Sequence, residues 1–354
     1  MLWNLPARTL WAAGSGLQAG SAQGAAETPE QKAVAAIPQY RPRQEVSGVL
    51  RLWGHGAPKL DFMGVLVKTW EDEFQSFQPG IRFEYDMYGT ASAMGALYSG
   101  AGDIAILGQE IYPFEVTAFE SVKHYPPQVI SIATGSLDVR NFDFAIVVFV
   151  HRTNPLARLT LEQLNRVFAY QRNPGANITS WGQLGLQGHW KDRPIRLYGW
   201  RADDVFSTFL QNRVLHGSHE WRCGVKEFAH IHRTDGTIYD SGKQILNELA
   251  NDADGIAFSN YRYQNDEVKP VAIAWRIPGP YWQATKETLI NQQYPLGRTI
   301  PAVIDRVPGR PVDVKVREFL LYLLSREGQQ QIVNNGKYLP LNPGAAAAGR
   351  RQLA

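Results

Sequence analysis

The sequence has a single cysteine, Cys223, among its 354 residues. An internal disulfide is therefore excluded, although a lone thiol is compatible with either redox compartment. No segment approaches the about 20 consecutive apolar residues that a membrane-spanning helix needs. The excess of one charge sign over the other is also small: the formal net charge is +3, and the basic residues are dispersed along the chain. We therefore have no reason to expect a nucleic acid or an anionic membrane as a partner.

What the chain does have is enough apolar sequence for two cores. Hydrophobic residues make up 44% of a length that exceeds the usual limit for a single core. Short apolar runs alternate with segments in which apolar residues recur every three or four positions, which predicts strands alternating with helices. The strands are expected at 49–53, 81–85, 103–107, 128–133, 144–150, 194–199, 226–233 and 255–261. This pattern predicts an α/β protein with mostly parallel sheets flanked by helices.

Four motifs occur in an order that is typical of one known family. They are FVHRTNPLARLTLEQLNRVFA with ITSWGQLG (149–185), DIAILGQE (103–110), YPLGRTIPAVI (294–304) and VREFLLYLLSREGQQQIVNNGKYLPL (316–341). Together they resemble the phosphate-type periplasmic substrate-binding proteins of ABC transporters. The resemblance covers roughly residues 48–342. It implies a two-lobe periplasmic-binding-protein fold (type 2) with the ligand cleft between the lobes.

The resemblance also implies a division of the chain. Lobe one is expected to be discontinuous (48–142 plus 271–342), and lobe two to span 143–270. Residues 1–47 are expected to be an export signal followed by a linker, which would make the protein periplasmic or otherwise exported. A disordered or misassigned start is the alternative, because glycines and Gln18 interrupt the apolar stretch. The last segment, 343–354, is expected to be a flexible tail.

A cleft of this kind suits an oxyanion. Parallel sheets bind ligands beyond the carboxyl ends of their strands, where helix N-termini supply unpaired N–H groups and about half a positive charge each. The family resemblance implies donors from the loops after the first two strands and from an Arg with a Gly-Ser-Gly-Thr turn in lobe two. The second loop, YGTASAMG, supplies Gly89, Thr90 and Ser92. Either the two hydroxyls contact a ligand, or one of them is only the N-cap of the helix.

The other candidates from lobe one match the family less well. The first loop, WGHGAPK, has His55 and Lys59, where the family more often has a hydroxyl. Lys59 either supplies charge to the ligand or is merely solvated. After the strand at 103–107, Gly108 and Gln109 are candidates, although Gln109 brings no charge and is equally typical of a solvent-facing loop. We expect Asp103 and Glu110 to bracket the edge of the cleft.

The lobe-two loop departs most from the family. Where the resemblance calls for Gly-Ser-Gly-Thr, the chain has Arg201 followed by Asp203 and Asp204. Without glycines the backbone cannot approach an anion as closely, and a carboxylate at a helix N-terminus occupies the positive end itself. Arg201 either binds an oxyanion in a bidentate manner or pairs with these carboxylates. A protonated oxyanion can still donate to one Asp.

Rival functions have weaker signals. His216, His219, Cys223, His230 and His232 lie close in sequence, but their spacing fits no standard zinc site, so we expect no metal. No GxSxG or HExxH motif occurs, and we expect neither catalysis nor a cofactor. The prediction is a monomeric receptor for a small oxyanion, phosphate first, that delivers it to an ABC importer. The alternative is a ligand-altered or ligandless relative that acts as an interaction or sensor module.

Overall fold

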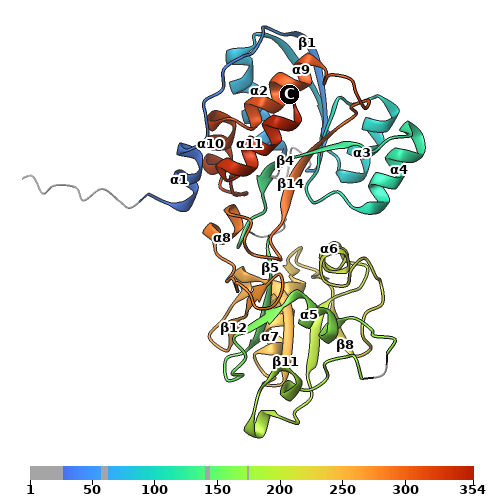
Figure 1. Cartoon of the computed structure of the whole chain (residues 1–354), viewed down its shortest axis with the longest axis vertical. Coiled ribbons are helices and arrows are strands. Elements are labelled where there is room, and N and C mark those ends of the chain that lie inside the picture. The colour runs from blue at the N-terminus through green and yellow to red at the C-terminus, as the bar shows by residue number, and fades with distance from the viewer. Residues whose placement is uncertain (1–26, 57–62, 140–143, 174) are drawn as a thin grey trace, which may run out of the picture.

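The computed structural model describes residues 27–56, 63–139, 144–173 and 175–354. Two five-stranded sheets, each flanked by helices, form an upper and a lower lobe (Figure 1). The predicted two-lobe α/β fold is therefore confirmed, but the prediction of mostly parallel sheets is wrong, because each sheet has two parallel and two antiparallel pairings. In the described part of the chain, no helix has the length and apolarity to cross a membrane. The predicted export signal falls largely on residues that lie outside this description.

The upper lobe is built on a sheet with the strand order β2-β1-β3-β14-β4. β1 pairs in parallel with β2 and β3, whereas β14 is antiparallel to both β3 and β4. Because the first three strands are parallel, their carboxyl ends meet at one edge of the sheet. The strands are β1 (Ser47–Gly54), β2 (Gly80–Asp86), β3 (Ile104–Ile106), β4 (Gln128–Thr134) and β14 (Thr299–Ile304).

Helices cover both faces of the upper sheet (Figure 1). The helix after β1 turns an apolar stripe to the core, since Leu66, Trp70 and Phe74 are fully buried. The indole N–H of Trp70 donates to the carbonyl of Gly328 at 2.8 Å, which fixes α2 against α10. The helices are α1 (Pro29–Ala35), α2 (Met63–Phe77), α3 (Thr90–Ser99), α4 (Pro113–Lys123), α9 (Val314–Leu323), α10 (Arg326–Asn335) and α11 (Pro343–Gln352).

The lower lobe is built on a sheet with the order β12-β5-β11-β7-β8. β11 is parallel to β7, which is parallel to β8, whereas β5 is antiparallel to β11. The apolar run at 144–150 is buried throughout, as a strand covered on both faces should be. The strands are β5 (Ile146–His151), β7 (Arg196–Trp200), β8 (Val225–Phe228), β11 (Gly255–Asn260) and β12 (Val268–Pro270).

Short elements complete the lower lobe. The single strand expected at 226–233 is wrong, because it breaks between β8 and β9 and the latter turns back to pair with β10. His230 and His232 therefore do not share one continuous strand face. The helices and short strands are β6 (Arg158–Thr160), α5 (Leu161–Phe168), η2 (Trp181–Leu184), η3 (Gly188–Trp190), α6 (Val205–Arg213), β9 (Ile231–His232), β10 (Ile238–Tyr239), α7 (Ser241–Leu249), η4 (Tyr261–Tyr263), β13 (Ala272–Ala274) and α8 (Lys286–Ile290).

Two chain passages join the lobes, and they are hydrogen-bonded to each other. The amide of Ile146 donates to the carbonyl of Leu296 at 3.1 Å, and the amide of Gly135 donates to the carbonyl of Arg298 at 2.9 Å. The return to lobe one that was predicted at residue 271 is wrong. β13 pairs with β6, and the apolar residues from Val271 to Leu296 belong to the lower core. The chain therefore returns to the upper sheet only after Leu296.

Both predicted unstructured ends carry packed helices within the described residues. Between 27 and 47, α1 begins with a capping box at Thr28, and Ile37 is fully buried. The flexible tail expected at 343–354 is likewise wrong, because α11 begins at an Asn342 cap and packs against β4. Alanine has the highest helix propensity, and the small Ala346 fits beneath the helix without exposure.

Candidate ligand-binding site

The loops after β1, β2 and β3 converge at the carboxyl edge of the upper sheet. The amide of Gly89 donates to the carbonyl of Gly54 at 3.0 Å, which joins the second loop to the first. The amide of His55 donates to the carbonyl of Ile106 at 3.0 Å, which joins the first loop to the third. The amide of Gly108 lies 3.4 Å from the hydroxyl oxygen of Thr90. The predicted candidates of lobe one are thus brought together, except Lys59, which lies outside the described residues.

The N-terminus of α3 is suited to an anion. Gly89 is its N-cap and offers no side-chain acceptor, so no cap bond occupies the amides of the first turn. The alternative that Thr90 or Ser92 is the N-cap is therefore wrong. Ser92 donates its hydroxyl to the carbonyl of Gly89 at 2.8 Å and is not available as a donor to a ligand. Thr90 accepts the contact from Gly108 through its oxygen, which leaves its own O–H for a ligand.

Close packing between His55 and Gly108 shapes the same edge. A Cβ atom on Gly108 would lie 2.3 Å from the Cγ and Cδ2 atoms of the His55 ring, so only glycine fits there. Burial lowers the pKa of the His55 imidazole, and the ring is neutral at neutral pH. His55 therefore offers a polar ring rather than a charge. Gln109 is half-buried and adjoins this edge.

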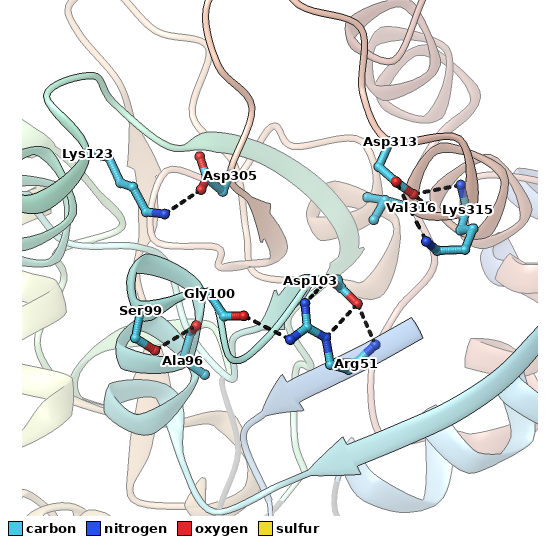
Figure 2. A network of polar contacts seen from close by, with 10 residues as sticks. All are labelled: Arg51, Ala96, Ser99, Gly100, Asp103, Lys123, Asp305, Asp313, Lys315 and Val316. Atoms are coloured by element: carbon cyan, nitrogen blue, oxygen red, sulfur yellow. Dashed lines mark hydrogen bonds and ion pairs between the residues drawn. The ribbon is translucent and has the colours of Figure 1, made fainter. Parts of the chain in front are cut away.

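The two acidic residues predicted at the cleft edge have other partners. Asp103 lies at the amino end of β3, where it pairs with Arg51 at 2.6 Å (Figure 2). Since the converging loops are at the carboxyl ends, the prediction for Asp103 is wrong. Glu110 accepts two bonds from the guanidinium of Arg298, at 3.0 and 2.8 Å, and one from the amide of Thr299 at 2.9 Å. Its carboxylate is therefore engaged by groups of the protein.

In the lower lobe, the loop between β7 and α6 carries the other candidates. Arg201 and Asp203 form an ion pair of 2.5 Å with both side chains exposed. Asp204 is the N-cap of α6 and accepts from the amide of Phe206 at 2.9 Å. Burial raises the pKa of Asp204, while the bond from Phe206 and the nearby His230 oppose this rise. Of the two alternatives for Arg201, the structure shows the one in which its guanidinium pairs with a carboxylate of the same loop.

Sequence reasoning missed residues that lie beside these loops. His230 accepts from the amide of Ser241 at 3.0 Å and lies 3.8 Å from Asp240, which caps α7. Arg298 lies fully buried beneath the third loop, with its guanidinium 4.8 Å from the ring centre of Phe209 in α6. The only feature of the sequence that could have indicated a role for Arg298 is its position as a single arginine just before an apolar strand. It links the upper lobe to the helix that follows Arg201.

The candidate residues of the upper and lower lobes carry little formal charge with which to bind an anion. Among the described residues, no hydrogen bond or ion pair joins Thr90 or Gly108 to the lobe-two loop. The only cation of the described candidates, Arg201, is paired with Asp203. An anion held here would rely on amide dipoles and hydroxyls. Within the described residues, no cluster of three or more His, Cys, Asp or Glu side chains is arranged to hold a metal ion.

Comparisons with known proteins agree with the two-lobe fold. No family model matches the chain. It is 27% identical over 321 residues to the phosphate-binding protein PstS of Pseudomonas aeruginosa, an alignment that covers 90% of this chain and 91% of the relative. The same identity and coverage are found for PstS of a second strain.

Two solved structures share the fold. PstS of Borrelia burgdorferi superposes with a TM-score of 0.55 at 14% identity, covering 84% of this chain and 100% of the other. An ABC-type phosphate transport receptor of Vibrio cholerae superposes with a TM-score of 0.50 at 16% identity, covering 83% and 100%. The chain therefore has the two-lobe fold of these periplasmic-type proteins. In sequence it is similar to phosphate-binding proteins over most of its length, which confirms the resemblance drawn from its motifs.

Proposed function

We propose that this chain is an extracytoplasmic receptor that binds phosphate and delivers it, as a monomer, to the membrane subunits of an ABC importer. The observation that carries the proposal is the N-terminus of α3, where Gly89 leaves the first-turn amides open beside the hydroxyl of Thr90 and the amide of Gly108. The names of the relatives support phosphate as the ligand. A receptor of this kind releases its ligand unchanged, so it needs no catalytic residue or cofactor.

We propose that the lower lobe completes the site through Arg201 and Asp204. Arg201 is exposed and can turn from Asp203 to a ligand at little cost, because an exposed ion pair contributes only about 0–1 kcal/mol. The raised pKa of Asp204 favours a carboxyl that shares a proton. Hydrogen phosphate carries such a proton and fully ionised sulfate does not. The lower lobe should therefore discriminate between these two anions.

The ion pair of Arg201 also favours the second candidate, a ligand-altered relative that serves as an interaction or sensor module. In that case Arg201 stays with Asp203 and the loop gives an anion no cation. The wild type would then bind neither phosphate nor sulfate well. Replacing Asp203 by Gly and Asp204 by Ser should create affinity, because glycine lets the backbone approach an anion and serine still caps α6.

Calorimetric titration of the wild type and of the Asp203→Gly, Asp204→Ser double variant with phosphate and with sulfate separates the two candidates. The receptor proposal expects the wild type to bind phosphate and to bind sulfate at least about tenfold more weakly, since a carboxylate left facing an unprotonated anion costs at least about 1.4 kcal/mol. The module proposal expects binding only after the double substitution. Equal, tight binding of both anions by the wild type would contradict both candidates.

A further inference from the structure

We propose that the upper lobe carries a second anion site, a pocket of about 510 Å³ that binds phosphate groups presented at least two at a time. Four arginines line it, and none of the described residues lining it is acidic. The pocket lies where the segment before β1 meets the helices α9, α10 and α11, a region visible in Figure 1. No lining residue belongs to the candidate site described above. The four arginines are Arg41, Arg43, Arg326 and Arg350.

Two of these arginines are held in place by neutral groups. Arg326 donates its Nε to the carbonyl of Ile37 at 3.0 Å and its Nη2 to the carbonyl of Ala35 at 2.8 Å. Arg350 donates its Nη1 to the carbonyl of Leu324 at 2.6 Å. A carbonyl orients a guanidinium without neutralising it, and a guanidinium has five N–H donors. Both side chains are therefore positioned, still charged, and supplied with further donors.

The other two arginines bring charge that the protein does not cancel. Arg41 and Arg43 are exposed, and neither forms an ion pair within the described residues. The acidic side chains nearest the pocket are turned to other donors. Glu318 accepts from the Tyr40 hydroxyl at 3.0 Å and the Arg43 amide at 3.1 Å, and Glu327 accepts from the Tyr40 amide at 2.7 Å.

The balance of charge at the pocket is positive. If both glutamates are ionised, four cations against two anions leave a charge of plus two. Burial lowers the pKa of Arg350, which is the response of a guanidinium that has lost water without gaining a carboxylate. An anion in the pocket would restore that partner. The site is built from both ends of the described chain, which explains why no run of basic residues in the sequence revealed it.

The chemistry of the pocket selects the class of ligand. The guanidinium fork matches phosphate oxygens in a bidentate manner, and four forks can hold more than one phosphate. The volume falls within the range of about 300–1,000 Å³ that is usual for small-molecule sites. Single phosphate ions leave most of this space unfilled. The ligand is therefore a condensed phosphate or phosphate ester in solution, or a phosphate-bearing lipid headgroup at a membrane surface.

The test uses the full chain with orthophosphate present throughout, so that the site between the lobes cannot account for the signal. Inorganic tripolyphosphate is titrated in a calorimeter, and co-sedimentation is measured with phosphatidylcholine vesicles with and without phosphatidylglycerol. The variant is Arg41→Gln with Arg43→Gln, since neither side chain supports the fold. The matched control is Arg82→Gln with Arg276→Gln, which removes the same charge from exposed positions outside the pocket.

The proposal expects the pocket variant to lose at least about tenfold in affinity, as deletion of charge-assisted bonds does, while the control keeps wild-type affinity. Loss confined to tripolyphosphate identifies a soluble ligand, and loss confined to the anionic vesicles identifies a lipid headgroup. Wild type that binds neither probe would overturn the proposal. Equal losses in the variant and the control would also overturn it, because they would show a general effect of net charge.

Discussion

Replacing Glu110 by glutamine removes the carboxylate that neutralises Arg298. The Arg298 side chain has 0% of its surface exposed and that of Glu110 has 16%, so the pair lies almost entirely inside the protein. Breaking a buried pair by removing one partner costs about 3–5 kcal/mol. Glutamine keeps one oxygen for the bonds that Glu110 now accepts, which places the expected loss near the lower limit, at about 3 kcal/mol.

The matched control is Asp203→Asn. It removes the same kind of charge from the Arg201 pair, in which the two side chains are 55% and 68% exposed, and should cost at most about 1 kcal/mol. Urea unfolding monitored by tryptophan fluorescence measures both free energies. Adding Arg298→Met to the Glu110→Gln variant should recover part of the loss, because it removes the uncompensated buried charge. Losses for Glu110→Gln and Asp203→Asn that agree within error would refute the reasoning.

Three further predictions follow from single contacts. Gly108→Ala should weaken phosphate binding in calorimetry, because the new Cβ must displace the His55 ring; unchanged affinity would show that this packing does not shape the site. Burial raises the pKa of the Glu71 carboxyl from 4.5 to about 7, so the free energy of unfolding should fall as the pH rises from about 4.5 to 7. In urea unfolding, Glu71→Gln should be up to about 3 kcal/mol more stable than the wild type at pH 8, but not at pH 4. Asn342→Ala should lower the free energy of unfolding by about 1 kcal/mol through loss of the α11 cap, whereas a flexible tail would show no change.

Features that depend on neighbours in sequence were predictable. The start of α3 at Thr90 follows from a glycine followed by helix-compatible residues, and the structure places it there. The pairing of Arg201 with Asp203 was one of two interpretations of the loop, and it involves residues only two positions apart in the sequence. Buried strands such as β5 were evident because every residue in the run is apolar.

Features that depend on distant segments were not predictable. Glu110 and Arg298 are 188 positions apart, and their contact exists only because β14 returns beside β3. Gly108 gives no sign in the sequence that the His55 ring lies against it. The end of the chain was misjudged because its alanines and glycines resemble a disordered segment. The helix α11 is stabilised by packing against β4, and its local composition alone does not reveal this.

The most direct test of the central claim is a pair of calorimetric titrations with phosphate, on Thr90→Val and on Thr117→Val. Thr90 lies at the open start of α3, whereas the hydroxyl of Thr117 donates to the carbonyl of Pro113 within α4. If the α3 N-terminus holds phosphate, Thr90→Val should lose roughly 1.5–3 kcal/mol of binding free energy, about 10- to 150-fold in affinity, and Thr117→Val should bind as the wild type does. Wild-type affinity in the Thr90→Val variant would contradict the claim that phosphate is bound at this helix.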